Sequence, residues 1–532
     1  MRRAPLPLLL LPLLLIIQAS AAHMAWAAKP GKGDKLEIKA PVEIVVETAP
    51  TEEEHAAAFA DYASEVARGQ TARAADALVA LVQDPTREPF RSEAYALLGD
   101  LLVRSDLPYG ALMAYSRSLG VDSQAAWSPK AIESAFNLAD RVGDVAVLEP
   151  VFAQNVGGDV DKPTRSRMAY LAARENYRQG KLGLTLGLLK LVVADSPVYA
   201  DALMLQGVVL NQQGKPNEAL KPLLEAYDVA NRTGRTGRFQ EALLLNVGRT
   251  FYAAQNYPRA IEYLAKVGRD SDFWLEAQFE RAWAHFRIDD MNGAIALLFT
   301  HDSPFFDDWY FPEGQLLRVY ALFLLCKFPE ASKQIDLFKA HYQPLHGQMK
   351  ATMTGLSAAD AFALAEGYVQ DGSSGSMPAS VMRSWAGDAR LEAAIVAVRH
   401  ADDELTRMRN VSANPFVAEV SGWLRARRDL IVQQEGERVR ERLQASTDGL
   451  GEMLTNVEIS KLDMLQFETR LYEQASATGK IADTERKVIR KERIRKGWVW
   501  WPWEGEYWVD ELGYFSVNAI PECPEGLRSS QE

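Results

Sequence analysis

The sequence predicts an all-α protein in which a solenoid of helical hairpins is followed by a helical or coiled-coil hairpin and an aromatic C-terminal tail. Three observations support this fold class: a twelve-residue spacing that recurs eight times, turn-forming residues within each recurrence, and long helical runs with heptad-like apolar positions after the array. The 532 residues exceed what one compact core normally holds, so an elongated array with a further domain is expected.

The recurring spacing joins pairs of mostly small residues in helix-favouring sequence. The pairs are Tyr62 and Ala74, Gly99 and Ala111, Phe136 and Leu148, Ala173 and Thr185, Gly207 and Ala219, Gly248 and Ala260, Ala282 and Ala294, and Val319 and Ala331. Successive pairs lie 34 to 41 residues apart. Two antiparallel helices joined by a short turn can approach closely where each carries a small side chain. The sequence therefore predicts about eight stacked hairpins within residues 51–345.

Glycines mark several of the expected turns. Gly69, Gly180 and Gly214 each stand five residues before the second member of their pair, where a helix end needs the left-handed backbone region. The third unit departs from the pattern, because Phe136 and Leu148 replace the small residues. We therefore expect an irregular third hairpin.

The period and its pattern resemble the tetratricopeptide repeat (TPR) family. The motif is clearest at Leu203, Gly207, Leu210, Gly214, Ala219, Leu220 and Ala226, and again at Gly248, Tyr252, Tyr257, Ala260 and Ile261. The resemblance implies units of about 34 residues stacked into a right-handed superhelix. It also implies that the first helix of each unit lines a concave groove that binds protein partners.

Helical spacing from the first small residue of each unit selects the candidate groove residues. They are Arg174, Tyr177, Arg178, Asn211, Arg249, Tyr252, Trp283, Phe286, Arg287 and Tyr320. Arginine and aromatic side chains dominate this set, and these types carry most of the binding energy at protein interfaces. The alternative is that several of them pack against the neighbouring repeat.

The N-terminal residues 1–28 have the composition of a secretory signal peptide. Arg2 and Arg3 precede an apolar run from Leu6 to Ile17, and small residues around Ala27 form a cleavage site. The run is too short to span a bilayer, which needs about 20 residues. An extended leader is expected over residues 29–50. The mature protein is then expected in the periplasm or outer envelope of a bacterium, or in the secretory path of a eukaryote.

After the array, residues 346–380 are predicted to form a capping helix and a linker, and residues 381–480 a long helical, coiled-coil-like domain. Helical runs extend over Leu391–Arg409, Phe416–Gln444 and Leu450–Gln474, with apolar residues at roughly heptad intervals. The pattern leaves open whether this domain packs within the chain or with a partner.

Residues 481–532 form a basic and tryptophan-rich tail. Its candidate docking residues are Trp498, Trp500, Trp501, Trp503, Tyr507, Trp508 and Tyr514. So many aromatic side chains favour docking on protein, either another subunit or this chain's own helices, with contact to a membrane surface or cell wall as the second possibility. The chain has two cysteines, Cys326 and Cys523, and the sequence leaves their pairing open.

No catalytic or metal-binding motif is present in the sequence, and its seven histidines are scattered. We therefore predict no enzyme activity, catalytic residue, metal, cofactor or small-molecule substrate. A net charge of -12 argues against nucleic acid as a partner.

These observations predict an exported, non-enzymatic scaffold that recruits other envelope proteins. The tail sequences from Gly505 to Trp508 and from Asp510 to Tyr514 are similar to those of envelope TPR proteins in bacterial gliding-motility machinery, which implies a subunit of such a complex. The alternative is a cell-wall or polysaccharide binder whose tail tryptophans stack on sugar rings.

Overall fold

The computed structural model describes residues 50–149, 151, 161–409, 414–478 and 504–522. These residues form helices joined by turns, with no strand among them, which confirms the all-α prediction. None of the helices in these ranges combines the length and apolarity needed to cross a bilayer. The predicted signal peptide, the leader up to residue 49 and the tryptophans from Trp498 to Trp503 lie outside the described residues.

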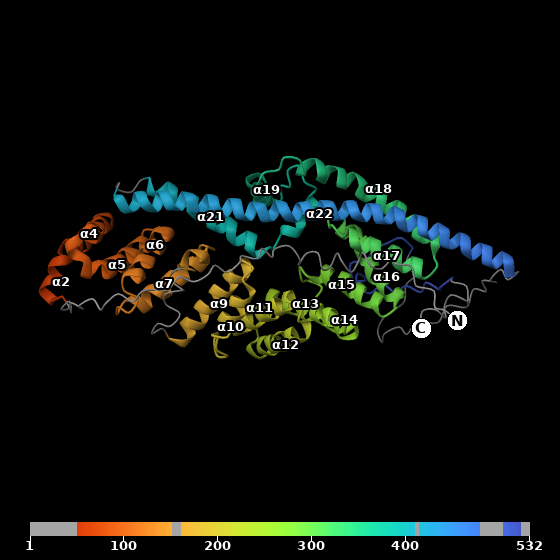
Figure 1. Cartoon of the computed structure of the whole chain (residues 1–532), viewed down its shortest axis with the longest axis horizontal. Helices are drawn as coiled ribbons and strands as arrows, with labels where there is room; N and C mark the ends of the chain where they lie inside the picture. Colours follow the sequence, from red (N-terminus) through yellow and green to blue (C-terminus); the bar gives the residue numbers. More distant parts are fainter. Residues whose placement is uncertain (1–49, 150, 152–160, 410–413, 479–503, 523–532) are drawn as a thin grey trace, which may run out of the picture.

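Helical hairpins follow one another along the length of the molecule (Figure 1). The first four units comprise α2 (Glu52–Ala58), α3 (Ala60–Ala67) and α4 (Thr71–Gln83); α5 (Arg91–Arg104) and α6 (Pro108–Val121); α7 (Ser128–Arg141); and α9 (Lys162–Arg178) and α10 (Leu182–Leu189). The next four comprise α11 (Tyr199–Gln212) and α12 (Pro216–Thr233); α13 (Arg238–Ala253) and α14 (Tyr257–Leu264); α15 (Trp274–Arg287) and α16 (Met291–Phe299); and α17 (Pro312–Leu324) and α18 (Phe328–Met353).

The third unit is irregular, as the sequence predicts. After α7 the chain forms a short 3-10 turn, η3 (Val145–Leu148), and the described residues Glu149 and Val151 that follow it are helical. Phe136 and Leu148 are both buried, so bulky side chains occupy the positions that are small in most other units.

In every unit, the turn after the first helix lies at the same position of the repeat. The left-handed backbone conformation occurs at Gly69, Asp106, Gly143, Gly180, Gly214, Gln255, Asp289 and Cys326. The three glycines predicted as turn residues are confirmed, and four units use another residue at the equivalent position. This regularity follows from the shared hairpin geometry, in which the first helix ends with a residue of positive φ.

Close packing of the two helices in a unit depends on the first small residue. A Cβ atom added at Gly207 would lie 2.3 Å from Cγ of Leu223, and one added at Gly248 would lie 2.6 Å from Cγ of Leu264. Each bulky partner stands one helical turn beyond the second small residue, and Ala219 is itself buried. The first helix therefore makes room for a leucine of the second helix.

The C-terminal region consists of α19 (Ala358–Asp371), the short α20 (Ala379–Met382), α21 (Ala389–Met408) and α22 (Pro415–Thr478). The two runs expected over 416–444 and 450–474 are parts of one 64-residue helix, α22, and the helical hairpin is formed by α21 and α22. Figure 1 shows α22 extending along the molecule from the end that carries α4 towards α17 and α18. We call the α21–α22 pair the brace.

Both ends of the array share a hydrophobic core with the brace. At the N-terminal end, Met408, Phe416, Val420 and Leu424 join the buried cluster of the first units. At the other end, apolar residues of α22 pack with α17, α18 and α19 in a second cluster. The helical domain predicted over 381–480 thus packs within its own chain.

Candidate interaction surfaces

The brace binds the second unit through a buried carboxylate. Glu404 of α21 accepts hydrogen bonds from the backbone N–H groups of Tyr109 (2.7 Å) and Gly110 (2.8 Å). Both groups belong to the first turn of α6, where helix N–H groups have no partner within the helix. Burial raises the pKa of Glu404 to about 7, although the two backbone hydrogen bonds favour the ionised form.

A second buried contact joins α22 to the third unit. Arg427 donates from Nε to Oδ2 of Asp144 at 2.9 Å, and its Nη2 donates to the other carboxylate oxygen. Asp144 is only 4% exposed. Burial by itself would lower the pKa of Arg427, but the bonds and charge of Asp144 raise it. The two ionised groups therefore compensate each other in a place that water hardly reaches.

At the opposite end the contacts are aromatic and ionic. The ring of Phe467 in α22 lies 5.9 Å from the rings of both Phe323 and Phe328, measured between centroids. Lys461 of α22 lies 2.7 Å from a carboxylate oxygen of Asp336 in α18. The brace therefore contacts the array near both of its ends.

The inner face is the side of the first helices that faces the brace, where Arg390 of α21 donates to the carbonyl of Arg178 at 3.2 Å. Three predicted groove residues on this face bond to an adjacent unit. Arg174 bonds to Asp140 at 3.0 Å, Asn211 to Oγ1 of Thr250 at 2.6 Å, and Arg249 to Glu280 at 2.6 Å. These contacts link successive first helices.

The aromatic groove residues also make local contacts. The rings of Tyr252 and Tyr257 lie 5.3 Å apart, and the guanidinium of Arg287 lies 5.3 Å from the Tyr257 ring centre. Trp283 packs edge-on against Phe286 at 5.8 Å. The remaining groove candidates, Tyr177, Arg178 and Tyr320, are half-buried.

The structure therefore spreads the ten groove candidates along successive units and does not gather them into one pocket. The middle of the inner face stays accessible to water: the side chains of Arg249 and Glu276 are 40% and 41% exposed. Burial raises the pKa of the neighbouring Glu280, despite its contact with Arg249. A partner would meet alternating charges here, and its binding to these residues remains a prediction.

The described tail, residues 504–522, lies on α15–α17 of its own chain (Figure 1). Leu512 is buried, and the N–H of Gly513 donates to Oγ1 of Thr300 at 2.9 Å. Two hydrogen bonds, of 2.8 and 3.3 Å, join Asn292 to the backbone of Ala519. The sequence predicts docking either on another subunit or on this chain's own helices. The described tail lies on the chain's own helices.

The candidate docking residues divide into three groups. The four tryptophans at positions 498, 500, 501 and 503 lie outside the described residues. Tyr507 packs edge-on against Phe515 at 5.8 Å. Trp508 and Tyr514 are 58% and 52% exposed, so the docked segment presents two aromatic rings to solvent. Sequence reasoning missed Leu512, which is buried against the array.

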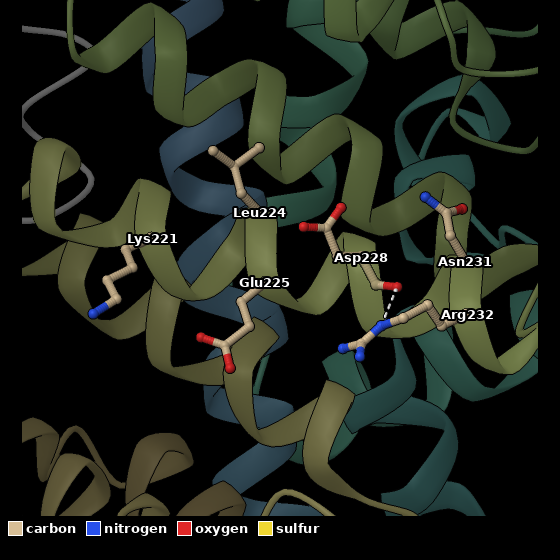
Figure 2. Close-up of a pocket in the computed structure, with 6 residues that line it drawn as sticks. All are labelled: Lys221, Leu224, Glu225, Asp228, Asn231 and Arg232. Atoms are coloured by element: carbon tan, nitrogen blue, oxygen red, sulfur yellow. Dashed lines mark hydrogen bonds between the residues drawn. The ribbon is translucent and has the colours of Figure 1, made fainter.

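A separate hollow runs along one face of α12 (Figure 2). Its volume is about 640 Å³, and its lining is Lys221, Leu224, Glu225, Asp228, Asn231 and Arg232. Nε of Arg232 donates to the carbonyl of Asp228 at 3.4 Å, and Glu225 accepts a hydrogen bond from Tyr199. This mixed, one-sided lining has no arrangement of nucleophile, base and oxyanion donors. In the described part of the chain, no three metal-ligating side chains cluster.

No family model and no curated protein matches the sequence. Solved helical-repeat structures do align with the chain. A tetratricopeptide repeat protein from Parabacteroides merdae is 13% identical, over 53% of this chain and 91% of its own, with a TM-score of 0.24. The C-terminal part of a TPR repeat-containing protein from Cytophaga hutchinsonii is 13% identical over 60% and 97%, with a TM-score of 0.29.

The Naa15/Naa10 structure bound to HypK-THB is 11% identical over 80% of this chain and 67% of that one, with a TM-score of 0.34. The chain's own geometry carries the fold assignment, because eight turns with the same conformation recur at the period of the family. The array is a TPR-like α-solenoid.

Proposed function

We propose that this protein is an exported, non-enzymatic scaffold that assembles other proteins in the bacterial cell envelope. The observation that carries the proposal is a helical array held near both ends by the brace, with accessible charged residues and half-buried aromatic residues along the middle of its inner face. α-Solenoids provide extended surfaces of this kind for partner proteins. A fixed array loses less conformational freedom on binding than a flexible one.

Two further observations support export. Residues 1–28 have the pattern of a signal peptide. Cys326 is disulfide-bonded, and disulfides persist mainly in oxidising compartments. Fractionation of cells that express the full chain should recover it in the envelope fraction. A variant that lacks residues 1–28 should remain in the cytoplasm, and envelope recovery of that variant would contradict export.

The gliding-motility assignment is the more specific part of the proposal. It rests on the similarity of the tail from Gly505 to Tyr514 to envelope TPR proteins of that machinery. Deletion of the gene in a gliding bacterium should stop movement, and the intact gene should restore it. Normal gliding of the deletion strain would remove this assignment and leave the scaffold proposal intact.

Crosslinking in envelope extract tests the scaffold function directly. The double variant Arg249→Ala with Trp283→Ala should lose at least one partner that the unchanged chain recovers, while its helix content stays the same. Arg259→Ala is the matched control. Arg259 belongs to the same unit as Arg249, but it lies on the second helix and is exposed. Equal recovery by all three chains would contradict the inner-face assignment. Retention on purified wall polymer instead of protein would favour the polysaccharide alternative.

A further inference from the structure

The end of the docked tail lies beside the turn between α17 and α18. The N–H of Glu522 donates to the carbonyl of Leu325 at 2.9 Å, and the carboxylate of Glu522 pairs with Lys327. Leu325 and Lys327 are the two chain neighbours of Cys326. The backbone of Glu522 is thus held at the residue that precedes this cysteine.

Cys326 occupies an unusual position for its residue type. Its φ is 54°, and it takes the turn position that glycine, aspartate or glutamine fills in the other seven units. A cysteine gains nothing from the left-handed region, where glycine has no steric cost. Its presence there is explained by its bond, because Cys326 is part of a disulfide. Cys523 is the only other cysteine in the chain, and it directly follows Glu522.

We infer that Cys326 and Cys523 form a disulfide that staples the tail to the last repeat and makes tail docking depend on redox state. In its formation, the two thiols lose two electrons and two protons to a protein disulfide, a thiol–disulfide oxidant, which becomes a dithiol. Reduction by a dithiol reverses the step and leaves the tail with its non-covalent contacts alone.

The disulfide fixes the position of the tail segment that exposes Trp508 and Tyr514 to solvent. Once the end of the tail is bonded, its remaining contacts with Thr300 and Asn292 form within one molecule at a high effective concentration. Without the bond, residues 504–522 have lost the anchor at one end. The exposed aromatic surface is therefore held in a fixed position only in the oxidised protein.

Peptide mapping tests the pairing. A non-reducing tryptic digest of the mature oxidised protein should contain residues 319–327 joined to residues 497–528, and reduction should separate them. Free thiols at both cysteines would overturn the inference. A reduction-sensitive dimer on a gel would also overturn it, since the bond would then join two copies of the chain.

Hydrogen exchange tests the consequence. Exchange in residues 504–522 should become faster, by on the order of tenfold or more, after treatment with dithiothreitol and in Cys523→Ser. Cys326→Gly should give the same result, and glycine suits the positive φ at this turn, so the repeat keeps its fold. Exchange in α11 and α12 should be unchanged and serves as the internal control. Unchanged tail exchange in both variants would overturn the redox dependence.

Discussion

The array and the brace are both helical, but different kinds of contact hold them. Polar contacts within the array join residues of neighbouring units, such as Arg249 and Glu280, which are 31 positions apart. The brace is held by contacts such as those from Arg427 to Asp144, 283 positions apart, and from Glu404 to Tyr109, 295 positions apart. A repeat array divides its stability among similar interfaces, whereas the brace joins residues far apart in the sequence, through these buried polar contacts and through the apolar clusters that it shares with the array.

The largest expected change in stability comes from a substitution in the core between the array and the brace. Trp385 is fully buried, and the guanidinium of Arg442 in α22 lies 4.5 Å from its ring centre. Trp385→Ala should cost about 3–5 kcal/mol in the free energy of unfolding, because it leaves a large cavity. Urea denaturation measures the change. Trp508→Ala is the matched control: Trp508 is exposed, so its loss should change stability by no more than about 0.5 kcal/mol. Similar midpoints for the two variants would show that α22 does not depend on this core.

A smaller effect is expected within one repeat. Gly207→Ala places a methyl group against the side chain of Leu223 and should cost on the order of 1–3 kcal/mol. Gly187→Ala is the control, since a Cβ at Gly187 of α10 meets no atom within 4 Å and alanine favours helix. The difference between their denaturation midpoints measures the close approach of α11 and α12. Two equal midpoints would mean that these helices are further apart.

The smallest effect is the pH dependence of the contact between α21 and α6. The pKa of Glu404 is about 7 in the folded protein, above its ordinary value of 4.5. The folded chain therefore keeps a proton that the unfolded chain releases, and stability should fall as pH rises from about 4.5 to about 7.

Glu404→Gln stays neutral at every pH and should lack this component. Unfolding midpoints at pH 5 and pH 8 measure it for both proteins. Equal stability of the unchanged chain at pH 5 and pH 8, with the same behaviour in the glutamine variant, would contradict a raised pKa of Glu404 at this contact.

Sequence reasoning succeeded where the determinants are local. The spacing of pairs such as Gly207 and Ala219 predicts the hairpins, and Gly69, Gly180 and Gly214 predict their turns, because each depends on residues within one unit. The contacts of Glu404 and Arg427 could not be predicted, because an isolated carboxylate or guanidinium on a helix does not indicate a partner nearly 300 positions away. The same limit applies to the tail, whose aromatic density predicts docking but not the surface it meets.

The groove candidates illustrate a second limit. Helical periodicity identified residues on the first helices, but it could not separate a side chain that faces a partner from one that bonds to the next repeat. Arg174 and Asn211 hydrogen-bond to residues of adjacent units, whereas Arg287 is exposed and lies over the ring of Tyr257 in the preceding unit. The side chains on the neighbouring helix decide the outcome, and the spacing within one unit does not contain that information.

The brace is docked on the array through matched buried groups. A double-mutant cycle with Asp144→Ala and Arg427→Met tests it most directly, with stability measured by urea denaturation. Removal of either partner leaves a buried charge and should cost about 3–5 kcal/mol, and the double variant should cost less than the sum by on the order of 1–3 kcal/mol. Additive effects, to within about 0.5 kcal/mol, would show that Asp144 and Arg427 do not interact and would contradict the docked brace.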